Sequence, residues 1–209
     1  MTTTTLAALA LAGGGTAFRA DAGAVIFRPD DACKGFVALS KGVIRVGLTS
    51  VNGRQIVLYR VRPGEICLQT FACLAQGRTY AAEGVVEEAV EGVLLAPGVF
   101  DTQLRQNSPF RAAVMSSIAL RFGDYEELVE ALAFTGLESR IAAALLRLAD
   151  EGGIARTTHE ALAAEIGSAR EAVSRQLSLM AGAGLVALSR GRVTILRPAA
   201  LGGLVEAPA

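Results

Sequence analysis

The first half of the chain alternates between short apolar runs and turn-forming residues. The apolar runs are rich in β-branched residues, which favours strands, and Gly, Pro, Asn and Asp separate them. Asn52-Gly53 lies between two such runs and predicts a tight hairpin, because both turn positions favour positive φ. Further turns are expected at 28–31, Lys41-Gly42, 62–65 and Glu91-Gly92. The spacing predicts an antiparallel sandwich or jelly roll with strands at 25–27, 36–39, 43–48, 56–61, 85–90 and 93–95.

The period changes at residue 108, where a helical pattern replaces the strand pattern. Between 108 and 132, apolar residues recur at alternating spacings of three and four, which is the seam of a helix that packs on a partner helix. The partner is either the β-roll of the same chain or a second copy of this helix, and periodicity alone leaves both interpretations open. The seam consists of Met115, Ile118, Phe122, Tyr125, Val129 and Leu132.

The last third of the chain predicts a winged helix-turn-helix. A helix over 137–150, with Ile141, Ala144, Leu145 and Leu148 on one face, ends at Glu151-Gly152-Gly153. Two helices follow, over 158–166 and 169–181, and Gly167 separates them. Runs at 185–188 and 193–196 flank a turn at 189–192 and predict a β-hairpin. The second helix of such a motif enters the major groove of DNA.

Capping boxes mark the starts of the two helices around Gly167. Thr157-x-x-Glu160 precedes the first helix and Ser168-x-x-Glu171 precedes the second. Gly136, directly before the helix over 137–150, is a candidate hinge or only a helix cap.

The second helix of the predicted motif separates apolar from polar positions. Val173, Leu177 and Met180 share one face and are expected to be buried. The other face carries Arg170, Glu171, Ser174 and Arg175. Arginine donates two hydrogen bonds to guanine, glutamate accepts one from cytosine, and serine contacts a base or a phosphate. A solvated charged face, with Glu171 serving only as a cap, is the alternative that the spacing leaves open.

Composition excludes several classes of protein. With 52% hydrophobic and 19% charged residues, the chain is too apolar to be disordered, and no apolar run is long enough to span a membrane. The opening residues carry no Lys or Arg before Leu6, so they predict a short helix and not a secretory signal. The 20 basic residues, of which only Lys34 and Lys41 are lysines, balance 20 acidic ones, and this charge neither supports nor excludes nucleic-acid binding. A Gly-rich phosphate loop, a metal-spaced histidine set and a nucleophile beside a base are all missing, so no enzyme is expected.

Residues 168–177 resemble the recognition helix of the cyclic-AMP receptor protein/fumarate–nitrate reductase regulator (CRP/FNR) superfamily. Residues 132–146 resemble that family's junction between dimer helix and DNA-binding domain, and 62–67 resemble its cyclic-nucleotide-binding-type β-roll. The resemblance covers roughly residues 20–200. It implies an α+β fold with an N-terminal antiparallel β-roll, a long dimerisation helix and a C-terminal winged helix-turn-helix. The corresponding domains are 1–107, 108–134 and 137–200.

The resemblance also implies a function. Members are homodimeric, sequence-specific transcription regulators on two-fold-related operators in double-stranded DNA, with RNA polymerase as a partner and no membrane. Arg170, Glu171 and Arg175 match positions that read a TGA-type half-site, and Ser174 matches the serine of the fumarate–nitrate branch. A dimeric interaction module without specific DNA binding is the alternative. Further DNA contacts are expected from Ser168, Thr158, His159, Arg190 and Arg192.

The ligand positions of the family indicate which kind of signal the β-roll is expected to sense. Cyclic-AMP binders of the family use a Glu for the ribose and an Arg-Ser pair for the phosphate. An ungapped alignment places Gln69 and Thr79-Tyr80 there, with Arg78 one position away. Since a cyclic phosphate needs a fixed cation, this candidate pocket is expected to lack cyclic-nucleotide binding, although a small-molecule ligand stays an alternative.

The three cysteines supply a second candidate for the sensor. Residues 64–81 correspond to the family's ligand cassette and are called the sensor cassette. Within it Cys67 and Cys73 bracket a segment that would line the family's ligand pocket, and Cys33 lies in an earlier turn. Three thiols cannot all pair, which favours free thiols in a reducing cytoplasm. They are either small core residues or a thiol switch that forms a disulfide, sulfenate or persulfide. No cofactor is expected: a soft metal on the cysteines is a weaker variant, three cysteines disfavour an iron–sulfur cluster, and His159, the single histidine, disfavours haem.

Overall fold

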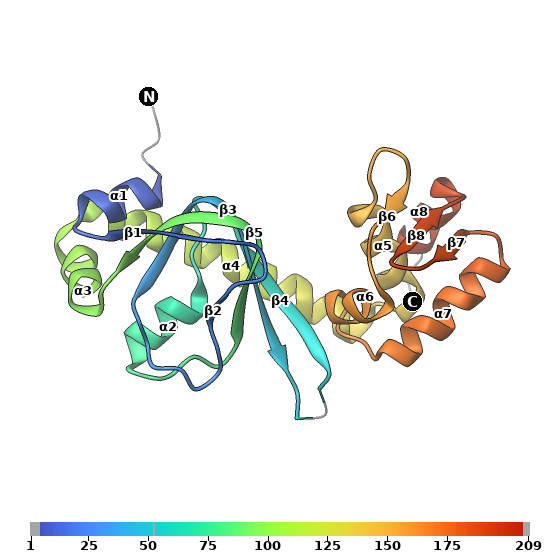
Figure 1. Cartoon of the computed structure of the whole chain (residues 1–209), viewed down its shortest axis with the longest axis horizontal. Coiled ribbons are helices and arrows are strands. Elements are labelled where there is room, and N and C mark those ends of the chain that lie inside the picture. Colours follow the sequence, from blue (N-terminus) through green and yellow to red (C-terminus); the bar gives the residue numbers. More distant parts are fainter. Residues whose placement is uncertain (1–4, 52, 207–209) are drawn as a thin grey trace. The chain divides into compact units, whose positions relative to one another are not determined.

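The computed structural model describes residues 5–51 and 53–206. Contacts divide the chain into two units (Figure 1). One unit takes in the chain up to Leu48 together with Leu58–Glu126. The other takes in Thr49–Val57 and the chain from Glu127 onwards.

The first unit is built on an antiparallel sheet, as the sequence predicts. Its strands follow the order β1-β5-β3-β4, and β2 also pairs with β5. The pairs of β5 with β1, β2 and β3 are all antiparallel. The strands are β1 (Thr16–Ala20), β2 (Val25–Phe27), β3 (Phe36–Thr49), β4 (Gln55–Val61) and β5 (Glu83–Leu95).

Two of the predicted turns are wrong, because β3 and β5 run through them. At Lys41-Gly42 the register against β5 shifts on both sides of Lys41, which is a β-bulge and not a turn. Gly42 has φ 78°, and a Cβ there would lie 2.2 Å from the carbonyl oxygen of Ala89. Glu91-Gly92 lies within the paired part of β5. Glycine inside a strand pattern therefore marks a bulge or a close backbone approach in this sheet.

The hairpin between β3 and β4 is confirmed. The amide of Ser50 donates to the carbonyl of Arg54 over 2.8 Å, which closes the loop, and Gly53 has the positive φ that the turn requires. Asn52 itself lies outside the described residues.

The helices of this unit are partly predicted. The N-terminal helix is confirmed as α1 (Leu6–Ala12), capped by the Thr5 side chain. The long helix is confirmed as α4 (Ser108–Phe134). Three elements were not predicted from the sequence: β1, α2 (Leu68–Gln76) and α3 (Pro97–Gln106).

One face of α4 packs on its own sheet unit. Phe110, Val114, Ser117 and Arg121 recur every three or four residues and are buried. Phe110 lies edge-on to Phe36, which stacks on Phe100 of α3 at 4.8 Å between ring centroids. The interpretation that places α4 on the β-roll is therefore correct for this face.

The second unit is a winged helix-turn-helix. A three-stranded sheet of order β6-β8-β7 packs with the helices. The prediction is confirmed except that β6 and α8 were not expected. The elements are α5 (Leu137–Leu148), β6 (Ile154–Ala155), α6 (His159–Glu165), α7 (Arg170–Gly182), β7 (Val186–Ser189), β8 (Arg192–Ile195) and α8 (Pro198–Glu206).

The buried faces of α5 and α7 are those that the periodicity predicts. Ile141, Ala144 and Leu145 of α5 are buried, and Leu148 packs at the edge of the same core. Val173, Leu177 and Met180 of α7 complete it. Gly136 is the N-cap of α5.

Both predicted capping boxes are one residue out of place. The N-cap of α6 is Thr158, whose hydroxyl accepts from the amide of Ala161 over 3.0 Å. The N-cap of α7 is Ala169, which makes no side-chain cap bond. Ser168 is instead buried, and its amide donates to the carbonyl of Ala163. Two adjacent threonines and a turn that draws Ser168 inward make these boundaries hard to read from spacing.

No helix in the described part of the chain has the length and apolarity of a membrane span.

Candidate DNA-binding surface and sensor cassette

α7 presents the predicted polar side chains on its outer face. Arg170, Glu171 and Arg175 are exposed, and Ser174 is half-buried. The buried apolar residues of the same helix hold it against α5 and the small sheet. This arrangement leaves two guanidinium groups, a carboxylate and a hydroxyl available along the first half of the helix.

His159 lies at the first position of α6 and joins this surface. Its Nδ1 is 3.1 Å from the Oγ of Ser174, and the two groups form a hydrogen bond between α6 and α7. Thr158, the neighbouring predicted contact, is exposed and uses its hydroxyl to cap α6. Ser168 is not brought to the surface, because it is buried beneath the turn.

Side chains of α5 contact α6 and the turn between α6 and α7. An Nη1 of Arg140 on α5 donates to the carbonyl of Ile166 over 2.7 Å. Arg147 of α5 pairs with Glu165 of α6. Gly167 has φ 63°, and a Cβ there would lie 2.6 Å from Leu132, so the turn accepts only glycine without a rearrangement. These contacts fix the direction of α7.

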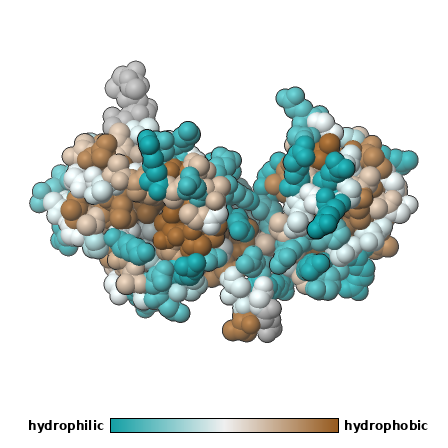
Figure 2. All heavy atoms as spheres, in the orientation of Figure 1, coloured by the Kyte–Doolittle hydropathy of each residue, from teal (hydrophilic) through white to brown (hydrophobic). Residues whose placement is uncertain are grey.

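The hairpin of β7 and β8 carries the other two predicted arginines. Arg190 and Arg192 are both exposed at its tip. The Nε of Arg192 donates to the Ser189 hydroxyl over 2.7 Å. Figure 2 shows hydrophilic side chains over much of the visible face of this unit. The tip therefore carries two exposed guanidinium groups, which suit the backbone phosphates that such hairpins contact.

The candidate ligand pocket of the first unit does not assemble as a nucleotide site. Tyr80 is buried, stacks on Phe27 at 4.7 Å and accepts a hydrogen bond from the amide of Lys34. The Oε1 of Gln69 accepts from the amide of Ala81 over 3.0 Å. Arg78 and Thr79 are exposed. Because no fixed cation meets a hydroxyl at these positions, they do not fit a cyclic phosphate.

The cysteines pair differently from the prediction. Cys33, in the loop before β3, forms a disulfide with Cys73 of α2, and their Cα atoms are 5.9 Å apart. Cys67 and Cys73 are six residues apart along one helical segment, which separates them by about 9 Å, beyond the reach of a disulfide. The expectation of three free thiols is therefore wrong for Cys33 and Cys73.

Cys67 is a core residue. It is fully buried, and its sulfur lies 4.0 Å from the hydroxyl of Tyr59. Burial raises the pKa of the Cys67 thiol, so it resists forming the reactive thiolate. The core-packing interpretation is correct for this cysteine. Among the described residues, no group of three or more His, Cys, Asp and Glu side chains is placed to hold a metal ion.

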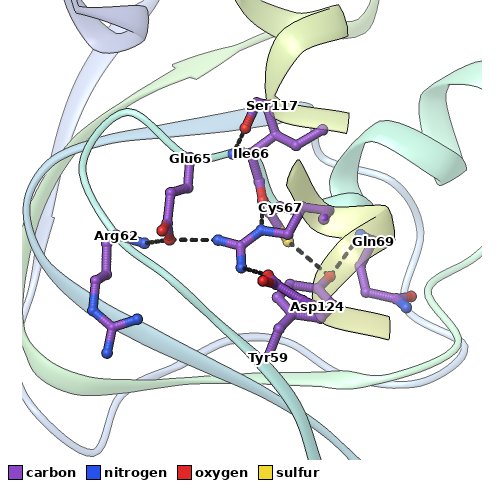
Figure 3. A network of polar contacts seen from close by, with 9 residues as sticks. Tyr59, Arg62, Glu65, Ile66, Cys67, Gln69, Ser117 and Asp124 are labelled. Carbon is purple, nitrogen blue, oxygen red and sulfur yellow. Dashed lines mark hydrogen bonds and ion pairs between the residues drawn. The ribbon is translucent and has the colours of Figure 1, made fainter. Parts of the chain in front are cut away.

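A polar network links this cassette to α4 (Figure 3). The side chain of Arg121 is only 5% exposed, and it pairs with Glu65 of the cassette and with Asp124 of its own helix. Its Nε donates to the carbonyl of Ile66 over 3.3 Å, and its guanidinium lies 5.1 Å from the centre of the Tyr59 ring. The amide of Ile66 donates to the Ser117 hydroxyl over 2.9 Å. The cassette and α4 are thus joined by directional contacts as well as by apolar packing.

The predicted seam of α4 divides into two groups. Ile118 and Tyr125 are half-buried against the core of the first unit. Met115, Phe122, Val129 and Leu132 are exposed, with Phe122 at 65% and Val129 at 61%. The helix therefore keeps an apolar stripe that the single chain does not cover.

Comparisons with known proteins agree with this architecture. A family model described as a cyclic nucleotide-binding domain matches residues 18–107, and a Crp-like helix-turn-helix domain matches 139–204. The transcriptional regulator LdrP of Thermus thermophilus is 30% identical over 171 residues, covering 78% of this chain and 83% of the relative. The cyclic AMP receptor protein of the same organism is 29% identical over 181 residues, covering 86% and 82%.

A solved structure extends the comparison to the whole chain. The structure of a protein assigned to the crp/fnr family from Eubacterium rectale matches with a TM-score of 0.85 and 25% identity. The match covers 96% of this chain and 94% of that one. Both units therefore have counterparts within one known architecture.

Proposed function

The chain belongs to the CRP/FNR family of DNA-binding transcription regulators, whose members are not enzymes, and we propose that it binds a TGA-type palindrome as a homodimer under thiol control. The observation that carries the proposal is the outer face of α7, where Arg170, Glu171 and Arg175 are exposed around Ser174. We assign the sensor to 1–107, the dimerisation helix to 108–134 and the DNA-binding domain to 137–200. The partners are an operator, a second copy of the chain and RNA polymerase, and the place of action is the cytoplasm.

Base reading is assigned to three side chains. Arg175 and Arg170 suit the paired acceptors of guanine, and Glu171 suits the amino group of cytosine. Arg190 and Arg192 at the hairpin tip, with Thr158 and His159 at the start of α6, contact phosphates and set the register. Operators of the form TTGA or GTGA, a spacer and the inverted half are therefore the expected targets.

Homodimer formation is supported by the open stripe on α4. Met115, Phe122 and Val129 are large apolar residues in solvent, which is costly for an isolated chain. A second copy of the same helix supplies a matching stripe at heptad spacing, as in other isologous dimers.

Thiol control is assigned to Cys33 and Cys73. In the reduced protein the two thiols lose two protons and two electrons to a hydroperoxide, which is itself reduced to water when the oxidant is hydrogen peroxide. The new disulfide ties the loop before β3 to α2. α2 starts beside Cys67 and the Arg121 network, so the disulfide changes the preferred position of α4. The position of α4 in turn changes the distance between the two recognition helices of the dimer.

The test is operator binding by fluorescence anisotropy at one salt concentration, with reduced protein, after hydrogen peroxide, and after added reductant. We expect a reversible change in affinity of tenfold or more. Cys33→Ser should abolish the response, whereas Cys67→Ala should keep it, because Cys67 does not pair.

Arg175→Ala tests the DNA face in the same assay. Loss of a bidentate guanine contact should reduce discrimination between the operator and a mutated half-site by about 5- to 150-fold, equivalent to about 1–3 kcal/mol. The matched control is Arg105→Ala, which removes an exposed arginine from α3.

The outcomes separate the parts of the proposal. If the protein binds the operator tightly and specifically with the same affinity before and after oxidation, the thiol switch is overturned. A small ligand in the β-roll is then the remaining signal. A lack of specific binding in both redox states overturns the half-site assignment.

A further inference from the structure

The single hydrogen bond between the side chains of His159 and Ser174 couples a titratable group to the DNA surface. We propose that His159 sets whether the Ser174 hydroxyl donates or accepts toward DNA, so that the protonation state of this histidine changes the base preference. The inference rests on the proposed binding of α7 to DNA, and it concerns the selectivity of that same surface.

Among the described residues, the hydroxyl of Ser174 has one hydrogen-bond partner, the imidazole of His159. Its Oγ lies 3.1 Å from Nδ1 of His159, and both residues are half-buried, so each keeps one side toward solvent. Ser174 sits between Glu171 and Arg175 in the exposed row of α7. A hydroxyl has one proton to donate and two lone pairs to accept with. If it donates to His159, it can only accept from a base, and if it accepts from His159, its proton is free for a base.

The two protonation states of His159 leave the Ser174 hydroxyl different hydrogen-bonding roles toward a base. In neutral imidazole with the proton on Nε2, Nδ1 accepts the Ser174 proton. The Ser174 oxygen can then only accept, which suits the amino group of adenine or cytosine. In the imidazolium both nitrogens carry protons, so Nδ1 donates to Ser174. The hydroxyl proton is then free for an acceptor on guanine or thymine.

Charged groups lie on α6, on the two helices that pack against it, and in the loop before β4, where an Nη2 of Arg54 donates to the carbonyl of Gly167 over 2.7 Å. On α6 itself these are Glu160 and Glu165, and on α7 they are Arg170, Glu171 and Arg175. On α5, which packs against α6, they are Glu138, Arg140 and Arg147. Arg147 is paired with Glu165, and Arg140 is directed at the carbonyl of Ile166.

The experiment compares two operators that differ only at the base pair facing Ser174, one presenting an amino group and the other an acceptor. Affinities are measured at about pH 6 and about pH 8, on either side of the ordinary histidine titration. For the wild-type protein we expect the preference between the two operators to change by threefold or more, toward the acceptor operator at the lower pH.

Three variants make the result specific. His159→Asn keeps a polar partner but does not titrate, so its preference should be the same at both pH values. Ser174→Ala should also lose the pH effect. The matched control is Ser178→Ala, one turn further along α7, where the hydroxyl donates only to the backbone carbonyl of Ser174, and it should keep the effect.

A second measurement works without DNA. Because the chain has one histidine, its imidazole ¹⁵N signals are unambiguous. In the free protein Ser174→Ala should shift the Nδ1 signal and change the tautomer ratio. Identical signals in the two proteins would overturn the proposal, as would specific operator binding with one base preference at both pH values. Loss of all specific binding, including the Arg175 effect, would instead contradict the proposed function.

Discussion

Burial gives Cys67 a chemistry different from that of Cys33 and Cys73. Its thiol is enclosed by the core of the first unit and faces Tyr59, whose pKa is also raised by burial. A thiol that keeps its proton in the folded state behaves as a small apolar side chain. The two cysteines that form a disulfide, Cys33 and Cys73, instead join the loop before β3 to α2.

The raised pKa of Cys67 makes stability depend on pH. Below about pH 8.5, the ordinary pKa of a cysteine thiol, this group is protonated in both the folded and unfolded states, and its contribution is complete. Above that pH the unfolded chain releases the proton first. The free energy of unfolding should therefore fall by up to about 1.4 kcal/mol per pH unit because of this residue.

Urea unfolding of the oxidised protein between about pH 8 and pH 10 measures this slope, since buried tyrosines titrate above about pH 10. Cys67→Ala should show a shallower slope than the wild-type protein. Equal slopes would mean that the thiol titrates normally despite its burial.

Single residues were predictable where one helix decides their environment. The exposed and buried sides of α7 follow from its period alone, so Val173 and Arg175 were assigned correctly. The disulfide was not predictable, because Cys33 and Cys73 are 40 residues apart and meet only through the packing of a loop on α2. The bond between His159 and Ser174 was missed for the same reason, although both residues had been selected.

At the scale of elements, α4 confirms for one of its faces the interpretation that places it on the β-roll, and packing of its exposed face on a second copy stays a prediction. Phe110, Val114 and Arg121 lie against the β-roll, whereas Phe122 and Val129 do not. The helical period was evident from the sequence. Which face of α4 packs on the β-roll depends on the arrangement of the sheet, which the period does not give. The short helices α2 and α3 were missed, because nine or ten residues carry too few turns for a clear period.

The open stripe of α4 predicts the effect of a single charge. Phe122→Glu should convert the proposed homodimer to a monomer, because a carboxylate cannot be buried between two apolar helices without a partner. Sedimentation equilibrium should show the halved mass, and operator affinity should fall at least tenfold as the second half-site contact is lost.

The matched control is Leu120→Glu. Leu120 lies on the same helix, is 71% exposed and is not part of the stripe. A dimer that survives Phe122→Glu, or one that Leu120→Glu breaks equally well, would place the interface elsewhere.

At the scale of the whole molecule, the change from a strand pattern to a helical one at residue 108 predicts a sheet unit followed by a helical unit, whereas contacts end the first unit at Glu126 and assign Thr49–Val57 to the second. The fold class was predictable because each half keeps one period over many residues. The bulges in β3 and the run of β5 through Glu91-Gly92 were not, because they depend on pairing between distant strands.

The two-fold symmetry of the proposed homodimer predicts how the distance between the two half-sites of an operator affects binding. The recognition helices of a dimer engage half-sites one helical turn apart, about 34 Å. Inserting about five base pairs between the half-sites rotates one of them by half a turn. Affinity in a gel-shift titration should then fall to that of a single half-site.

An isolated half-site on DNA of the same length serves as the reference. Undiminished affinity for the inserted operator would show that each chain binds its half-site independently.

The network around Arg121 also determines where this protein can be recombined with a relative. A chimera that takes its β-roll from one parent and α4 from another would set a buried guanidinium against a foreign loop, unless Glu65 and the Ile66 carbonyl came with it. A junction placed after Asp124 keeps all these partners in one parental segment, close to the boundary between the units at Glu126. Exchanging the DNA-binding part of the molecule therefore requires that nearly the first five turns of α4, up to Asp124, stay with the sheet.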